Sequence, residues 1–278
     1  MQLEDEFGDI VAKARIGNGL SDIGLAAKSG LSERDLQLIE SYRLTPDRAT
    51  IGRISALLSL DAPKLAAIAE GTWTPRIADP SDEVMLISGI LVPFGSYSEN
   101  AYVVACKRTR MAGVIDPGGR VDEINKRLAD ESLILSNVLI THAHGDHIGG
   151  IRELLAGQTG VVVTSSPIDR EAVMRGIDAR WQPADDGARL DVGELTATAL
   201  ATPGHTVGST CYAFEGACFV GDTLFAGSIG RPSRAEVYAV MLDAIKCKIL
   251  ALPGATALLP GHGPATTVAQ EIEHNPFF

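Results

Sequence analysis

Three histidines and an aspartate occupy six consecutive positions in the segment HAHGDH. The chain has only six histidines, so half of them lie in this one turn. His142 and His144 are two positions apart, and an extended backbone therefore points both side chains to the same side. Gly145 then lets the chain turn, so that Asp146 and His147 reach the same place. The segment predicts a site for one or two metal ions.

Three further motifs place metal-binding side chains directly after apolar, strand-like runs. ALATPGH ends in His205, FVGD ends in Asp222 and ALLPGH ends in His262. Each side chain follows a predicted strand and a glycine, as expected for a site assembled at one edge of packed sheets. His274, in EIEHNPFF, lacks this context and is predicted to be a surface or packing residue.

The donor set constrains the ion. Five imidazoles and two carboxylates, without a thiolate, favour zinc, iron(II) or manganese over a closed structural zinc site rich in cysteine. Seven donors are too many for one ion. We therefore expect two divalent ions, zinc first with iron or manganese as alternatives, that share a carboxylate and lower the pKa of a water between them.

Two unlike regions must position these side chains. Short β-rich runs such as NAYVVACK, TCYAF and ACFVGD begin at residue 84, interspersed with helical stretches such as RVDEINKRLADE and EVYAVMLDAIKCKILAL. This pattern predicts an α/β domain with sheets covered by helices. Two prolines and several small or polar residues precede it and indicate a linker. We assign residues 1–72 to a helical domain, 73–83 to the linker and 84–278 to the sheet domain.

The first region carries helix signals only, with predicted caps at Ser21, Ser32 and Asp61. Its segment AAKSGLSERDL resembles the second helix, the turn around Gly30 and the third helix of the Cro/CI-type helix-turn-helix repressors. This resemblance covers roughly 55 residues and implies a small all-α helix-turn-helix-like domain.

DNA binding requires basic and amide side chains on the third helix. Here Arg34 and Gln37 stand among Glu33, Asp35 and Glu40, and residues 1–75 hold 8 Lys/Arg against 11 Asp/Glu. We therefore favour homodimerisation through these helices, or a cover over the metal site, and keep DNA binding as an open alternative.

Composition narrows the class of protein. The formal charge of -11 over 278 residues gives no general attraction for nucleic acid or an anionic membrane. The acidic start MQLEDEFGDI lacks the pattern of a secretory signal, and no stretch is long and apolar enough to span a membrane. We expect a cytoplasmic protein whose four cysteines (Cys106, Cys211, Cys218 and Cys247) are buried and reduced.

The motifs THAHGDH, TPGHTVGS, FVGDTLF and LPGHGP, in that order, resemble those of the metallo-β-lactamase fold superfamily. That resemblance implies a four-layered αββα sandwich with its metals at one edge of the sheets. IDPGG, GDTLFAGSIGR, GHGPATT and the terminal E…NPFF are similar to the short, glyoxalase II-like hydroxyacylglutathione hydrolases. This closer resemblance implies thioester hydrolysis, in which a hydroxide between the metals attacks the carbonyl and one metal polarises its oxygen.

The resemblance also implies roles for individual residues. One metal would be held by His142, His144 and His205, and the other by Asp146, His147 and His262. Asp222 would bridge the two metals, which makes Asp146 and Asp222 the catalytic carboxylates. Asp116, Thr141 and Ser209 would orient ligands.

Two departures concern the substrate. GRPS replaces the family's common GRTD, and Arg231 within it is a candidate for holding a substrate carboxylate, with a surface salt bridge as the alternative. The chain ends soon after His262, without the C-terminal helical region that binds glutathione in longer relatives. Tyr97, Arg175, Arg180 and Trp181 are predicted to lie in loops that border the cleft.

Other activities stay open. A persulfide dioxygenase, which looks similar in these motifs, would use one iron(II) held by His142, His205 and Asp222. A lactonase, or a regulator that senses a thiol or acyl metabolite and binds DNA, would use the same fold. A β-lactamase is disfavoured by the missing export signal, and a nuclease by 16 Lys/Arg against 24 Asp/Glu over residues 76–278.

Overall fold

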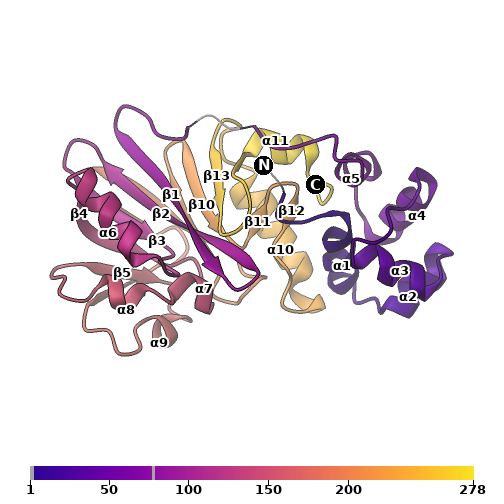
Figure 1. The fold of residues 1–278 in the computed structure, drawn as a ribbon, viewed down its shortest axis with the longest axis horizontal. Coiled ribbons are helices and arrows are strands. Elements are labelled where there is room, and N and C mark those ends of the chain that lie inside the picture. The colour runs from indigo at the N-terminus through magenta and orange to yellow at the C-terminus, as the bar shows by residue number, and fades with distance from the viewer. Residues whose placement is uncertain (1–2, 77–78) are drawn as a thin grey trace.

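The computed structural model describes residues 3–76 and 79–278, so that residues 77 and 78 of the predicted linker lie outside the described residues. Helices form the N-terminal region, and two six-stranded sheets with flanking helices form the rest (Figure 1). The N-terminal helices are α1 (Phe7–Gly17), α2 (Asp22–Ser29), α3 (Glu33–Glu40), α4 (Arg48–Leu58) and α5 (Ala62–Ala69).

The predicted caps are confirmed. The side-chain oxygens of Ser21, Ser32 and Asp61 each accept a backbone N–H at the start of α2, α3 and α5, which satisfies donors that a first helical turn leaves unpaired. Gly30 ends α2 in the left-handed conformation, with φ of 74°, and turns the chain into α3. Arg34 of α3 is exposed, and DNA binding by this helix stays a prediction.

The two sheets place several strand ends at common edges. The first sheet has the order β1-β2-β3-β4-β5-β6 and the second the order β14-β13-β10-β9-β8-β7. Strands β3 to β6 are parallel, as are β10 and β13, and the other pairs are antiparallel. The strands are β1 (Met85–Phe94), β2 (Tyr97–Cys106), β3 (Met111–Ile115), β4 (Ile134–Leu139), β5 (Val162–Ser165), β6 (Arg180–Pro183), β7 (Arg189–Val192), β8 (Leu195–Ala201), β9 (Thr210–Phe214), β10 (Ala217–Gly221), β13 (Ala257–Pro260) and β14 (Thr266–Thr267).

Four layers result, as the resemblance to the metallo-β-lactamase fold implies. Between the sheets lies a core that includes Tyr102, Tyr212 and Phe219, while a second core joins the first sheet to its helices. A third core joins the second sheet to the helices beyond it (Figure 1). Strands β10 and β13 are buried along their whole length, because both faces of their sheet are covered. The flanking helices are α6 (Val121–Asp130), α8 (Ile151–Leu154) and α9 (Arg170–Val173) on one side, and α10 (Tyr238–Ala244) and α11 (Val268–His274) on the other.

Some elements differ from the prediction. The short strands β6, β7, β11 (Leu224–Phe225), β12 (Ser228–Ile229) and β14 were missed, because two to four residues carry little pattern of their own. The stretch predicted as one long helix is divided into a 3₁₀ turn (η1, Ala235–Val237), α10 and a π-helical turn (η2, Ile245–Ile249). Cys247 is exposed, contrary to prediction, because η2 turns Ile245 and Ile249 to the core instead.

The helical region and the sheet domain share one core. Ile10 and Ala14 of α1 belong to the same apolar cluster as Tyr238 and Met241 beyond the second sheet. A buried ion pair between Lys13 and Asp5 lies at this junction, and Lys13 Nζ also donates to the carbonyl of Ile229, 2.8 Å away. The first helix is thereby attached directly to the β11–β12 hairpin. Within the described residues, no helix has the length and apolar character needed to cross a membrane.

A buried carboxylate of α11 also binds the β11–β12 hairpin. Glu271 of α11 accepts hydrogen bonds from Gly227 N (3.0 Å), Thr266 Oγ1 (2.8 Å) and Asn275 Nδ2 (2.8 Å). Burial raises the pKa of Glu271 to about 7, although these hydrogen bonds favour the charged form.

We expect this carboxylate to lower the stability of the protein as the pH rises from about 4.5 to 7. The folded state keeps the proton to a higher pH than the unfolded chain does, so that folding is favoured on the acid side of this window. Glu271→Gln should remove this loss of stability, which amounts to about 3 kcal/mol of unfolding free energy between pH 4.5 and 7. Urea unfolding from pH 4.5 to 8 measures the difference, and the exposed Glu273→Gln should keep the wild-type slope. Equal slopes in all three proteins would contradict the assignment.

Candidate metal centre

All the predicted metal-binding side chains follow the ends of strands at one edge of the sandwich. The segment with three histidines follows β4 and enters the short helix α7 (Gly145–Ile148). His205 follows β8, Asp222 follows β10 and His262 follows β13. One group therefore comes from the first sheet and the rest from the second, so the packing of the sheets sets the distances between them.

Hydrogen bonds fasten the two sheets to each other at this edge. Tyr102 of the first sheet donates through its hydroxyl to the carbonyl of Pro260, 2.7 Å away. Tyr212 of the second sheet donates to the carbonyl of Ile140, 2.8 Å away. Both bonds end on segments that carry candidate ligands, so the spacing of those segments is fixed by buried tyrosines.

Two glycines allow the close approach of the chain segments. Gly221 has φ of +48°, and a Cβ on it would lie 2.4 Å from Thr141 Oγ1. A Cβ on Gly261 would lie 2.5 Å from Asp222 Oδ1. Any larger residue at either position would push the ligand segments apart.

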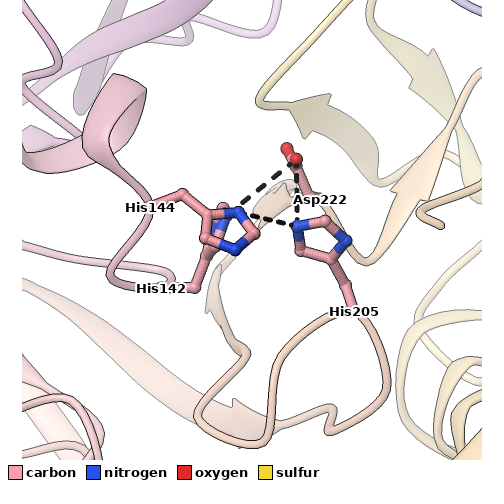
Figure 2. Close-up of side chains that lie close together, drawn as sticks. All are labelled: His142, His144, His205 and Asp222. Carbon is pink, nitrogen blue, oxygen red and sulfur yellow. Dashed lines mark hydrogen bonds and ion pairs between the residues drawn. The ribbon is translucent and has the colours of Figure 1, made fainter. Parts of the chain in front are cut away.

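His142, His144, His205 and Asp222 form a first group, whose ligand atoms all lie within 4.8 Å of one another (Figure 2). His144 Nδ1 is 3.0 Å from His142 Nε2 and 3.1 Å from His205 Nε2. Asp222 Oδ2 lies 3.4 Å from His205 Nε2. Three imidazole nitrogens and a carboxylate oxygen therefore converge on one small volume.

Asp146, His147 and His262 form a second group within the same limit. Asp222 lies between the two groups, since its Oδ1 is 3.5 Å from His147 Nε2 and its Oδ2 is 3.6 Å from His262 Nε2. These are the two sets that the resemblance implied, with Asp222 adjacent to both.

The second nitrogens of four imidazoles are fixed by oxygen acceptors, which leaves Nε2 free to face the site. His147 Nδ1 lies 2.9 Å from Asp116 Oδ2, His205 Nδ1 lies 3.0 Å from the Arg231 carbonyl, and His262 Nδ1 lies 2.7 Å from the Ser98 carbonyl. His142 Nδ1 lies 3.1 Å from Thr141 Oγ1. This arrangement is usual for metal-binding histidines.

Two further observations fit a metal. His147 Nε2 and Asp222 Oδ1 are buried and have no hydrogen-bond partner among the described residues. Burial, with four neighbouring histidines, also holds the pKa of His142 well below its usual value, so that its nitrogen lone pair is available. Burial lowers the pKa of His147, but Asp116 and the nearby carboxylates raise it to about 9, so a cation that binds at its Nε2 would displace a proton. The residues present therefore fit divalent cations.

Asp116 positions neighbouring residues of this metal centre through hydrogen bonds. Its carboxylate accepts hydrogen bonds from Thr141 N (2.7 Å) and Thr141 Oγ1 (2.5 Å), as well as from His147. The residue has φ of +47°, an unfavourable conformation for an aspartate that the surrounding contacts maintain.

Replacing Asp116 with asparagine should weaken metal binding about 10- to 100-fold. The amide loses the charge that holds His147 Nδ1–H, so the ring can turn away from the site. Competition with a chelating zinc indicator measures the affinity of each site. The exposed Asp122→Asn serves as the control, and equal affinities in the two variants would argue against the role.

The other predicted positions differ in what they contact. Ser209 Oγ accepts from Thr206 N, 3.0 Å away, and so orders the loop that carries His205 rather than a ligand itself. Arg231 holds His205 through its backbone carbonyl, while its exposed side chain lines the cleft. His274 packs against Trp73, with ring centroids 5.0 Å apart.

A cleft of about 360 Å³ opens above the two groups. Tyr97 lines it, but from β2 rather than from a loop. Arg180 and Trp181 lie in β6 at the far end of the first sheet, and neither they nor Arg175 line the cleft. The predictions for Arg180 and Trp181 were wrong because the order of the strands, unknown from sequence, places β6 at an outer edge. Arg175 lies in a turn, as predicted, but it lines a different pocket.

Sequence reasoning missed several residues at this site. Glu99 is fully buried, neither of its oxygens has a hydrogen-bond partner among the described residues, and burial beside three aspartates raises its pKa to about 11. Its neutral form therefore avoids adding a further negative charge. The other missed residues that line the cleft are Phe225 of β11 and five residues of the helical region, namely Glu4, Asp5, Asp9, Lys13 and Tyr42. A lysine on the apolar face of the first helix was the only signal among them.

Comparison with known proteins agrees with the fold. The sequence pattern of the Metallo-beta-lactamase superfamily matches residues 95–273. The chain is 34% identical over 203 residues to the probable metallo-hydrolase YqgX of Bacillus subtilis (strain 168), covering 67% of this chain and 95% of that protein. It is 30% identical over 207 residues to the hydroxyacylglutathione hydrolase GloC of Haemophilus influenzae (strain ATCC 51907 / DSM 11121 / KW20 / Rd), covering 67% and 96%.

Solved structures also share this fold. The BLEG-1 B3 metallo-beta-lactamase has a TM-score of 0.58 at 32% identity, covering 68% of this chain and 99% of its own. ETHE1 from Myxococcus xanthus has a TM-score of 0.57 at 31% identity, covering 68% and 83%. TTHA1623 in a di-iron-bound form has a TM-score of 0.56 at 29% identity, covering 68% and 100%. About a third of this chain therefore lies outside these likenesses, and helices α1 to α5 precede the superfamily match.

Proposed function

The chain belongs to the metallo-beta-lactamase superfamily, and we propose that it is a two-metal hydrolase that cleaves a thioester. The observation that carries the proposal is the pair of donor groups that have Asp222 in common. One ion would use His142, His144 and His205, and the other Asp146, His147 and His262. Similarity to proteins called hydroxyacylglutathione hydrolases supports the substrate class.

The chemistry divides between the ions and the chain. Bound divalent cations supply Lewis acidity, which makes water nucleophilic near neutral pH and polarises a carbonyl. Asp222 fixes the spacing of the two groups, and Asp116 fixes His147. The Glu99 carboxyl group stays neutral beside them, so it adds no further negative charge to the carboxylates of the site. A thiolate is a good leaving group, and the chain therefore needs no strong general acid.

Metal content and turnover test the proposal together. The protein is purified without chelators from cultures supplied with zinc, iron and manganese, and its metals are measured by elemental analysis. We expect close to two ions per chain and release of free thiol from S-lactoylglutathione or simple acyl thioesters. The proposal fails if metal-replete protein leaves all of these thioesters intact.

A persulfide dioxygenase is the second candidate, because its three expected ligands, His142, His205 and Asp222, lie close together (Figure 2). The Nε2 atoms of the two histidines are 3.9 and 3.4 Å from Asp222 Oδ2. One iron per chain, nearly free of zinc, together with oxygen uptake in the presence of glutathione persulfide would favour it. Lactone hydrolysis is measured on the same samples, since an activated water can also open an ester ring.

A further inference from the structure

The N-terminal region forms one wall of the cleft above the metal-binding groups. Five residues that precede β1 line this cleft beside the metal-binding side chains, namely Glu4, Asp5, Asp9, Lys13 and Tyr42. All five precede the part of the chain that matches the superfamily. A substrate that occupies the cleft therefore meets side chains that lie outside that match.

Glu4 is held beside one of the metal-binding loops. It packs against Gly263, the residue after His262, where a Cβ would lie 2.7 Å from Glu4 Cβ. Gly263 has φ of 72°, so its conformation as well as the available space favours glycine. The next residue along the chain, Asp5, is fixed by its buried ion pair with Lys13. The Glu4 carboxylate thus extends into the cleft from a fixed backbone.

Two carboxylates of this wall have no cationic partner. Neither Glu4 nor Asp9 forms an ion pair within the described parts of the chain, and Asp9 accepts hydrogen bonds from the neutral Tyr42 hydroxyl (2.6 Å) and the Glu6 backbone N–H (3.0 Å). The Lys13 ammonium is bound by Asp5 and the Ile229 carbonyl, and it also lies over the Phe225 ring. The wall therefore presents uncompensated negative charge to the cleft.

Aromatic rings lie in the same cleft. Tyr42 and Tyr97 both line it, and these side chains are 57% and 44% exposed, so a bound molecule can reach them. A quaternary or protonated amine is attracted both by carboxylates and by aromatic rings. The combination of unpaired carboxylates with accessible rings therefore favours an organic cation as the group that occupies this wall.

The positive charge of the cleft has a different source. Arg231 is exposed and forms no ion pair among the residues that the structure describes, and cations bound by the two donor groups would add to its charge. A carbonyl oxygen is therefore favoured beside the donor groups, and a cationic nitrogen beside Glu4 and Asp9. This separation of charge would give a bound substrate one preferred orientation.

We propose that the N-terminal wall selects substrates that carry a cationic nitrogen, with Glu4 and Asp9 as the specificity-determining residues. The substrate class, which rests on the proposed thioester hydrolysis, is then a thioester with an ammonium or quaternary ammonium group. The same two carboxylates disfavour anionic thioesters. Tyr42 keeps Asp9 in place through its hydroxyl group.

Acetyl thioesters of similar shape and different charge test the proposal. Acetylthiocholine carries a trimethylammonium group, 3,3-dimethylbutyl thioacetate has a neutral tert-butyl group in its place, and S-acetyl-2-mercaptoethanesulfonate carries an anion. We compare kcat/KM between the wild type and the double variant Glu4→Gln with Asp9→Asn, because the intrinsic reactivity of each ester cancels between the two proteins. The preference for acetylthiocholine over the neutral ester should fall about tenfold in the double variant, mainly through KM.

A second series places the charge on the acyl side. The ethyl thioesters of 4-(trimethylammonio)butanoate and 5,5-dimethylhexanoate have the same shape and differ by one charge. The series whose preference depends on Glu4 and Asp9 identifies the side of the scissile bond that faces the wall.

Two controls isolate the effect of charge in the cleft. Glu33→Gln removes an exposed carboxylate of the helical region that does not line the cleft, and it should keep the wild-type preference. High salt should reduce the preference of the wild type, because it screens accessible charges. If the double variant takes up zinc more slowly but keeps the preference, the two carboxylates guide metal ions and the proposal is overturned.

A binding measurement keeps this proposal separate from the proposed function. Saturation-transfer NMR with the zinc-loaded protein detects contact with the N-methyl groups of choline, and 3,3-dimethyl-1-butanol is the neutral molecule of the same shape. We expect a choline signal that the double variant loses. If no thioester is cleaved while this difference remains, the thioesterase assignment fails and the cation assignment holds. If neither choline binding nor the ester preference depends on Glu4 and Asp9, the cation assignment is overturned.

Discussion

Asp222→Asn is expected to reduce turnover on the order of 10²- to 10³-fold and to lower the metal content from two ions per chain to one or fewer. The carboxylate oxygens lie 3.4 Å from His205 Nε2 and 3.5 Å from His147 Nε2, between the two donor groups. An amide has one acceptor oxygen and no charge, and its NH₂ group would face an imidazole nitrogen. Elemental analysis and thiol release measure the two effects on the same preparation.

The control is Asp243→Asn, an exposed aspartate on α10 that should leave metal content and turnover unchanged. Full metal content with unchanged turnover in Asp222→Asn would show that this residue does not join the two groups. A loss of only one ion, with residual turnover, would still agree with a shared ligand.

Lys13→Met is expected to destabilise the protein by about 3 to 5 kcal/mol. Lys13 and Asp5 are 5% and 7% exposed, and removal of the ammonium leaves a buried carboxylate without its counter-charge. The carbonyl of Ile229 also loses its donor. Because this pair attaches the first helix to the β11–β12 hairpin, we expect the loss to appear in urea unfolding of the full chain.

Two comparisons isolate the cause. The double variant Asp5→Asn with Lys13→Met removes both charges and should recover most of the lost stability. Arg48→Met breaks the ion pair with Glu70, in which the arginine is 77% exposed, and should have a much smaller effect on stability than Lys13→Met. Equal effects of Lys13→Met and Arg48→Met would mean that burial of the first pair has no energetic consequence.

The sequence alone was sufficient for the elements that local pattern encodes. Helix caps are set by residues three positions apart, and Ser21, Ser32 and Asp61 were therefore predictable. The alternation of apolar runs with glycine turns predicted sheets covered by helices and placed every candidate metal donor after a strand, while the four-layered sandwich was implied by the family resemblance. Short edge strands and the π-helical turn were not predictable, because their pairing depends on neighbours that are distant in the chain.

The kinds of donor and their number were thus determined by the sequence, and so was the expectation of two ions. The spacing of the donors along the chain did not determine which of them meet, because the distances between four loops depend on how the two sheets pack. The family resemblance implied the two groups, and the tertiary structure brings their donor atoms together. It also decided that Arg231 contacts His205 through a backbone carbonyl, a group that every residue carries. The contribution of the N-terminal helices to the cleft was decided in the same way, since the apolar core that docks them joins residues more than 200 positions apart.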